Sequence, residues 1–392
     1  MAAWSVFQAR VKAIKINGVL AFPVLLYLLM CLSIVWSADG GAASKGLVRE
    51  LPLLVLPLVF WLRPQYTRHQ ANAILRFFTA AVVVSGCFYI GKAIFRYLTI
   101  HDANVFYYHE LAGDNAIYVS AIFSLAVFFL ASIQQKKVGH YIALVFLMGC
   151  LILLSSKLIV VIDILILSGY FFITAKMKLQ TRLILILAAI GSMLVLGYYS
   201  RIKDRIIQEY VSNTSQAPVY INEGGASGYV YDVSMREAWQ KPVFSQGDRF
   251  TGTSFRVYQA RIFTEMLKED NIFWKGFGLG ASQNAIARKD KEHNLFCGTA
   301  AMSGYQTMNF HNQYLQAFAE LGLFGLLILL ALLLINLKCA VKQKYFVHIA
   351  FAILMIALFL TESFLWRQRG VVFFTLLYCL FNTIAAKEKT TV

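Results

Sequence analysis

Long apolar runs separated by short polar stretches make up most of the 392-residue chain. An apolar run of roughly 17 residues or more can cross the hydrocarbon core of a bilayer, about 30 Å thick, as an α-helix. The pattern therefore predicts an all-α, polytopic integral membrane protein of about ten transmembrane helices. The expected spans are 18–36, 46–62, 74–98, 114–132, 140–154, 157–174, 181–199, 313–337, 346–362 and 369–385.

One long polar stretch, from about residue 200 to 312, separates the seventh predicted span from the eighth. A bare connection of this length is uncommon, so the segment needs structure of its own. Apolar residues at helical spacing in 254–269 predict an amphipathic helix, while the Gly- and Ser-containing 222–234 reads as loop. We expect three parts: helices 1–7 in 1–199, a large periplasmic loop in 200–312, and helices 8–10 in 313–392.

Basic residues occur in every second connection between the predicted spans. By the positive-inside rule these connections face the cytoplasm, which places both termini there and the long loop outside. The rule applies to basic residues in short connections. A long loop is translocated largely regardless of its charge, so the charges of 200–312 do not conflict with an outer location. The basic connections include Lys12, Arg63, Lys136, Lys178, Lys342 and Lys387.

Composition agrees with a membrane protein and excludes several classes of function. The chain is 59% hydrophobic and 14% charged, whereas soluble domains have about a quarter charged residues. Its net charge of +16 is dispersed among short loops, so no nucleic-acid partner is expected. The six cysteines show no zinc-binding spacing, and the chain contains no HExxH or Walker motif. "KGFGLG" (275–280) matches no nucleotide-binding spacing and is interpreted as turn glycines, so neither a metal nor a cofactor is expected.

A polar quartet opens the eighth predicted span in "MNFHNQYLQAFAELGLFGLL" (308–327). An imidazole titrates near neutral pH, so His311 is a candidate general base that removes a hydroxyl proton. The alternative is a polar helix start in which Asn309 or Asn312 is the cap. Tyr314 shares a helical face with His311 and could orient a substrate, or it could be an interfacial aromatic anchor.

Cations are expected to be rare in short outer connections, yet several lie at the predicted outer ends of the spans. They suggest an anionic ligand such as a diphosphate, although contact with anionic lipid is an alternative. Lys157, Asp163, Glu320 and Glu362 lie within predicted spans, where charges are costly unless paired. Glu320 falls opposite His311 on a regular helix and is interpreted as a structural ion-pair partner. The outer cations are Arg49, Lys157, Arg201, Lys203, Arg205, Arg367 and Arg369.

"FHNQYLQAFAELGLFGLL" (310–327) resembles the motif of the O-antigen ligase and O-antigen polymerase family, in which His-Asn ends a long periplasmic loop and precedes a Glu-x-Gly. "SSKLIVV" resembles the family's Ser-Arg step, with Lys157 in place of the arginine and therefore without a bidentate fork. "SFRVYQARIF", with Arg256, and "GFGLG" resemble its loop. Segments 51–60, 107–120 and 361–374 are similar to members from a Bacteroidetes-like branch. Members of the family often have about twelve spans, so the sequence leaves open whether one or two N-terminal helices are missing.

The resemblance implies a GT-C-type glycosyltransferase in the bacterial inner membrane, with a periplasmic active site and metal-independent, inverting chemistry. Its donor would be an undecaprenyl-diphosphate-linked glycan, and its acceptor a sugar of the lipid A core or a growing glycan. His311 would take the proton of the acceptor hydroxyl. Arg256, Lys157 and Arg201 would stabilise the departing diphosphate, with Asn312 and Tyr314 also in the substrate-binding set. No cofactor is implied.

Three other functions remain open at this point. A polymerase would use the same chemistry to join repeat units on the lipid carrier, and the compact loop only slightly favours a ligase. A relative that glycosylates proteins is a further alternative. A non-enzymatic transporter or flippase of lipid-linked sugars would need charges throughout a central cavity, whereas the cations here gather at one predicted face, which favours an enzyme.

Overall fold

A computed structural model describes residues 17–62, 65–113, 115–154, 156–174, 191, 201–214, 219–223, 226–298 and 303–385. The predicted span 181–199 lies outside the described residues, apart from Gly191. Each of the other predicted spans coincides with an apolar helix. These helices are α2 (Ala21–Ser33), α4 (Pro52–Trp61), α5 (Arg68–Ile100), α7 (Ala116–Ser132), α8 (Val138–Leu153), α9 (Lys157–Thr174), α15 (Gln313–Gln343), α16 (Phe346–Leu358) and α17 (Gln368–Asn382).

Two of these helices, α5 and α15, are long and apolar enough to cross a membrane by themselves, and several of the others are shorter apolar helices. The chain is therefore mostly helical and has the features of a membrane protein, while the number of spans remains a prediction. The second predicted span is divided into α3 (Gly40–Glu50) and α4. Pro52 lies at the beginning of α4, where the N–H that proline lacks has no partner within the helix.

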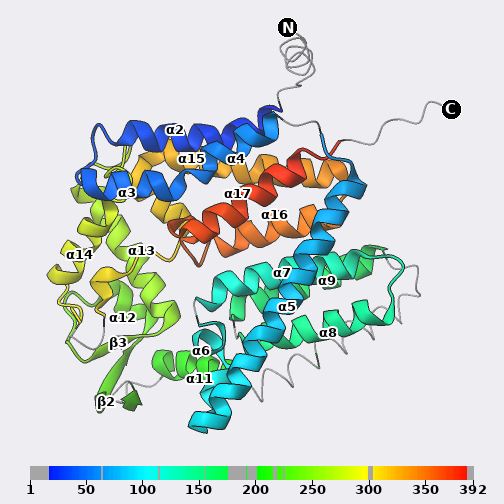
Figure 1. The fold of residues 1–392 in the computed structure, drawn as a ribbon. Helices are drawn as coiled ribbons and strands as arrows, with labels where there is room; N and C mark the ends of the chain where they lie inside the picture. The colour runs from blue at the N-terminus through cyan, green and yellow to red at the C-terminus, as the bar shows by residue number, and fades with distance from the viewer. Residues whose placement is uncertain are drawn as a thin grey trace.

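The apolar helices form two groups, with α2, α4, α15, α16 and α17 in one and α5, α7, α8 and α9 in the other (Figure 1). Phe346 of α16 joins the groups, since its ring lies 6.2 Å from Phe128 of α7 and 3.7 Å from Tyr170 of α9. Close packing of such side chains holds helices together where lipid surrounds them, because burial from water supplies little there.

The two ends of the helices make different contacts. At one end Arg68 Nη2 donates to the Gln343 carbonyl (2.7 Å), and the N–H of Tyr66 donates to the Thr383 carbonyl (3.0 Å). At the other, which we call the outer end, the Trp36 indole donates to the carbonyl of Lys275 (2.9 Å) in the long polar segment. The outer end also carries η2 (Ala103–Phe106), α6 (Tyr108–Ala112) and η4 (Phe364–Trp366).

Most of the long polar segment forms a unit at the left of Figure 1, with α11 (Arg201–Thr214) at the lower centre. We call the described residues of 201–312 the outer domain. Its own core contains Phe250, Tyr258, Ile262 and Phe310. The predicted amphipathic helix is confirmed as α13. The elements are α11 (Arg201–Thr214), β1 (Val219–Glu223), β2 (Ala226–Val233), α12 (Met235–Gln240), β3 (Asp248–Phe250), α13 (Gly252–Glu269), α14 (Ser282–Glu292) and η3 (Tyr305–Thr307).

The outer domain contains a small sheet that the sequence did not predict. β2 pairs antiparallel with β1 and parallel with β3, in the order β1-β2-β3. The interpretation of 222–234 as loop was therefore wrong, because it weighed Gly and Ser above the alternating Tyr and Val of "GYVYDV" (228–233), which favour extended backbone. Arg249 of β3 then fixes the register through two bonds to Asp232 of β2 (2.7 and 3.1 Å).

Three glycines attach the outer domain to α15. Gly276, Gly278 and Gly280 all have positive φ, so "KGFGLG" is a series of turns, as predicted. The N–H groups of Phe277 and Gly278 donate to the carbonyls of Ala319 and Glu320 (2.8 and 2.9 Å). Those carbonyls can accept because Gly322, at φ 66° and ψ −162°, interrupts the helix there. The assumption of a regular helix after His311 therefore fails just beyond Glu320.

Stability of the outer domain is expected to depend on pH through Asp290 of α14. This side chain is 1% exposed and accepts a hydrogen bond from the Tyr258 hydroxyl (2.9 Å). Burial raises the pKa of Asp290 to about 7, from the ordinary value near 4. The folded state thus holds this proton more tightly than the unfolded state. The free energy of unfolding therefore falls by up to about 4 kcal/mol as pH rises from about 4 to 7, and it is constant above that range.

Asp290→Asn is expected to remove this dependence. Near pH 4 the variant and the wild type should unfold at similar temperatures, and near pH 8 the variant should be the more stable. Thermal unfolding of the full chain in detergent at both pH values tests this expectation. An equal fall in stability with pH for both proteins would contradict it.

Candidate active site

His311 lies in the turn just before α15 and has a left-handed backbone (φ 46°). Its N–H donates to the Asn309 side chain (2.9 Å), and its own side chain is 27% exposed. The neighbouring Asn312 is the cap, because its side-chain oxygen accepts from the N–H groups of Tyr314 and Leu315 (2.9 and 3.1 Å). Capping is therefore assigned to Asn312, and the imidazole of His311 is not needed for it.

A buried carboxylate faces the imidazole. Oε2 of Glu362 lies 3.5 Å from Nδ1 of His311, and the Glu362 side chain is 4% exposed. A carboxylate at this position favours the tautomer with its hydrogen on Nδ1, which leaves Nε2 to accept a proton. The separation is at the outer limit of a hydrogen bond, and such contacts often shorten only when substrate is bound.

From the sequence, Glu362 was expected to be an acidic residue within a predicted span, where an unpaired charge is unfavourable, but it was not assigned to the active site. The one feature of the sequence that pointed to a role for Glu362 was the unfavourable free energy of a charge in a membrane span, which requires a partner for the carboxylate. Its partner, His311, lies 51 residues away in the turn before α15, so spacing along the sequence could not identify it.

The connection between α16 and α17 (359–367) holds the other members of the site. Its Thr361 carbonyl accepts from Arg256 Nε (2.9 Å), and its Leu360 carbonyl accepts from the Asn312 side chain (3.1 Å). The hydroxyl of Ser363 accepts from the Asn312 N–H (3.2 Å). Arg256 of α13 and His311 are thus positioned by the same short segment. The ring of Phe255 also packs against that of His311, with 5.9 Å between centroids.

Lys157, at the start of α9, is connected to the same region by a contact with α11. Its Nζ lies 3.2 Å from Oε2 of Glu209. A Cβ placed on Gly252 would lie 3.4 Å from Nη1 of Arg256 and 3.8 Å from Oε1 of Glu209. The structure therefore brings two of the predicted diphosphate ligands, Lys157 and Arg256, to the beginning of α13. Arg201, Lys203 and Arg205 belong to α11, but their side chains lie outside the described residues.

Tyr314 and Glu320 have neighbours other than His311. The Tyr314 hydroxyl donates to the Ile356 carbonyl (2.9 Å), which ties α15 to α16, so its role in orienting a substrate remains a prediction. Glu320, 4% exposed, accepts from Gln316 (2.8 Å) and from Ser282 (3.1 Å). Among the described residues, no cation lies within ion-pair distance of Glu320.

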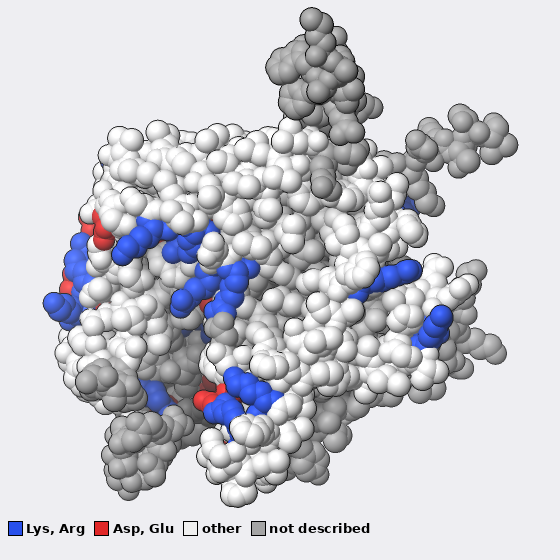
Figure 2. Space-filling view, in the orientation of Figure 1, with Lys and Arg blue, Asp and Glu red and all other residues white. Residues whose placement is uncertain are grey.

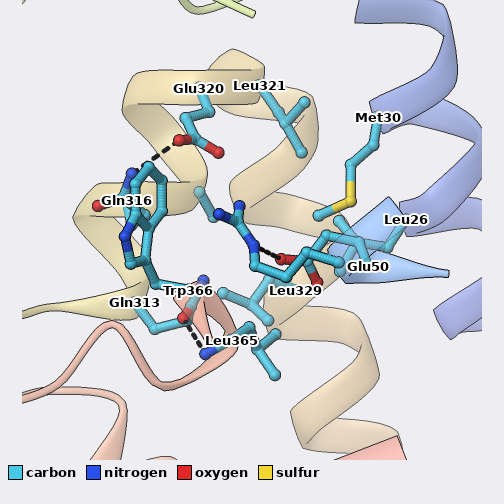
Figure 3. A pocket seen from close by; sticks show the side chains of 12 residues that line it. Leu26, Met30, Glu50, Gln313, Gln316, Glu320, Leu321, Leu329, Leu365 and Trp366 are labelled. Atoms are coloured by element: carbon cyan, nitrogen blue, oxygen red, sulfur yellow. Dashed lines mark hydrogen bonds and ion pairs between the residues drawn. The ribbon is translucent and has the colours of Figure 1, made fainter. Parts of the chain in front are cut away.

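Glu320 lines a small cavity of about 20 Å³, with Gln313, Gln316, Glu50 and Trp366 around it (Figure 3). Such a volume holds a water molecule but not a sugar ring. Arg49 also lines this cavity and pairs with Glu50 (3.1 Å). The cavity therefore joins α3, α15 and η4 by polar contacts and is not a substrate site. In the described part of the chain, no group of three or more His, Cys, Asp or Glu side chains is arranged to hold a metal ion.

Glu362→Gln is expected to lower kcat of a reaction catalysed by His311 by about tenfold to a hundredfold, with little change in KM. Glutamine preserves the shape and an acceptor oxygen but cannot stabilise an imidazolium by its charge. Steady-state rates at varied acceptor concentration measure both constants. Glu292→Gln, on the exposed face of α14, is the matched control and should behave as wild type. Unchanged kcat in Glu362→Gln would show that the carboxylate does not assist His311.

These features define a helical membrane protein with an outer domain and, at the junction, a histidine–carboxylate pair beside clustered cations. Residues 142–330 match the family model described as O-Antigen ligase. Over these residues the chain is similar to the O-antigen ligase family, which confirms the resemblance carried by the His-Asn motif. The match includes Lys157, Arg256 and His311, whereas Glu362 lies beyond it. None of the curated proteins matches the chain significantly.

Proposed function

We propose that the protein is an inverting, metal-independent, GT-C-type glycosyltransferase that moves an undecaprenyl-diphosphate-linked glycan to a sugar of the lipid A core. The observation that carries this proposal is the His311–Glu362 pair, positioned by the segment that also holds Arg256. Its similarity to the O-antigen ligase family over residues 142–330 supports a ligase or a related polymerase.

In the proposed reaction, a hydroxyl oxygen of the acceptor attacks the anomeric carbon of the donor sugar. Nε2 of His311 takes the hydroxyl proton while the bond from the anomeric carbon to the diphosphate oxygen breaks. The diphosphate leaves with the electron pair, and the charge that develops on it is stabilised by Arg256 and Lys157, with Arg201 completing the set. Attack on the face opposite the leaving group inverts the anomeric configuration.

Glu362 supports the proton transfer without touching the substrates. Its carboxylate stabilises the imidazolium that forms on His311, and it keeps Nε2 directed at the acceptor. The diphosphate is a good leaving group once cations hold it, so His311 does not need a metal or a nucleotide to complete the transfer.

The proposed location is the bacterial inner membrane, with both termini in the cytoplasm and the site at the periplasmic face. Its support is the gathering of the outer domain, the start of α15 and the α16–α17 connection at one end of the helices (Figure 1). Lipid-linked donor and glycolipid acceptor would both reach this end from the outer leaflet.

A transfer assay in proteoliposomes tests the proposed function. Wild-type protein would be supplied with undecaprenyl-diphosphate glycan and lipid A core, with a chelator and without added metal, and the products would be separated by mass. Glycan on the lipid A core is the expected product. Elongation of the lipid-linked glycan alone would identify a polymerase. No transfer to either acceptor would contradict glycosyltransferase activity.

A further inference from the structure

We propose that Arg367 and Arg369, together with Arg49, bind an anionic group of the acceptor, a phosphate or a carboxylate, beside His311. This inference rests on the proposed function and assigns the outer cations to two separate sets. The donor set is the one proposed above, Lys157 and Arg256 at the starts of α9 and α13 with Arg201 of α11. The acceptor set is Arg49, Arg367 and Arg369, from the end of α3 and the start of α17.

Stacking on aromatic rings holds two members of the acceptor set in place. The guanidinium of Arg49 lies over the Trp366 ring at 4.5 Å, and that of Arg369 lies over the Tyr118 ring at 4.7 Å. A guanidinium stacked by its face has its N–H donors along the edge of its plane, which is the geometry for bidentate binding of phosphate or carboxylate. The aromatic rings therefore orient the arginines before any ligand arrives.

Arg367 carries a charge that its surroundings do not neutralise directly. Its side chain is exposed, and among the described residues no acidic side chain lies within ion-pair distance of it. Lys157 and Arg49 differ from Arg367 in this respect, because Lys157 pairs with Glu209 and Arg49 pairs with Glu50. The positive-inside rule makes basic residues uncommon in a short outer connection, so two arginines at the start of α17 need a reason beyond solubility.

The acceptor set adjoins the catalytic histidine through the α16–α17 connection. Tyr118 donates from its hydroxyl to the Phe364 carbonyl (3.2 Å), just beyond Glu362. Arg369 stacks on the ring of the same tyrosine, and Arg367 ends the connection that carries Glu362. An anion held by these arginines would therefore place the rest of its molecule next to His311, where the attacking hydroxyl must lie.

The surface agrees with a site that opens outward. Lys and Arg side chains gather around a recess between the outer domain and the helices, including a group over α3 and the start of α17 (Figure 2). Two substrates must meet at one histidine in a glycosyl transfer, and the donor brings its own diphosphate. The second set of cations lies on different elements from the first. A second anionic substrate therefore explains it better than an extension of the donor site does.

A binding experiment on the full chain tests this assignment without turnover. Wild-type protein and the double variant Arg367→Gln/Arg369→Gln would be placed in phosphatidylcholine nanodiscs. The probe is lipid A core in three forms: intact, dephosphorylated and carboxyl-reduced. We expect the double variant to bind the intact probe at least about tenfold more weakly. The difference should vanish for the form that lacks the recognised anion, and Arg367→Lys/Arg369→Lys should recover part of the affinity.

The exposed Arg236→Gln on α12 is the matched control and should bind the probe as wild type does. An equal loss for all three probes, or no loss, would overturn the inference. So would weaker binding of the undecaprenyl-diphosphate donor, because the arginines would then belong to the donor set. A difference seen only for retention of phosphatidylglycerol would mean a lipid-headgroup site and would overturn it too. If wild type binds as expected yet transfers nothing, the proposed function fails and this inference stands.

Discussion

His311→Ala is expected to lower the rate of glycan transfer by about 10²- to 10⁴-fold, the contribution of a positioned general base. The acceptor hydroxyl would have to lose its proton to water, since the next basic group, Glu362, is buried behind the imidazole. Binding of both substrates should be nearly unchanged because His311 acts on the transferring proton. Single-turnover transfer in proteoliposomes measures the loss directly.

The matched control is His69→Ala, an exposed histidine in the first turn of α5 at the opposite end of the helices. It should transfer glycan at the wild-type rate. Both variants must elute and unfold like wild type, since Asn312 still caps α15 without the imidazole. If His311→Ala kept most of its activity, His311 would be only a residue of the helix start, and another base would have to be sought.

Gly322→Ala is expected to destabilise the protein by more than about 3 kcal/mol and to prevent its correct assembly. At φ 66° and ψ −162°, Gly322 occupies a backbone region that is essentially restricted to glycine. A Cβ there would lie 2.3 Å from the backbone C and O atoms of Trp274, which no side-chain rotation can relieve. Either the break in α15 or the attachment of the outer domain would have to give way.

Thermal unfolding in detergent, followed by size-exclusion chromatography, measures this effect. Gly149→Ala in α8 is the control, because a Cβ on Gly149 meets no atom within 4 Å and alanine favours helix. It should leave the unfolding temperature unchanged or raise it slightly. A Gly322→Ala protein that unfolds within a degree or two of wild type would show that the break tolerates a side chain.

The structure gives a physical reason for the glutamate and the glycine in the Glu-x-Gly of the motif. Gly322 interrupts the helix, and the interruption releases the carbonyls that accept hydrogen bonds from Phe277 and Gly278. Glu320 instead joins the polar cavity that connects α15 to α3. Both residues serve the attachment of the outer domain to the helices, and through it they position Arg256 and His311.

The sequence alone determined the helical class, the amphipathic α13, the turn glycines and the resemblance to the O-antigen ligase family. Apolar runs of bilayer length and helical periodicity are local patterns, so they can be recognised without knowledge of the fold. The His-Asn motif is equally local. The sheet of the outer domain was missed because Tyr and Val compete with Gly and Ser over a few residues, and pairing with β3 decides the outcome.

Only the tertiary structure decided which distant residues share the site. Glu362 meets His311, and Thr361 meets Arg256, because α16 ends and α17 begins at the outer end, near α13 and the start of α15. Along the sequence the outer cations could not be told apart, whereas in the structure Arg256 lies beside Gly252, and Arg49 and Arg369 stack on Trp366 and Tyr118. Chemistry at a site depends on separations of a few ångströms, which periodicity along the chain does not encode.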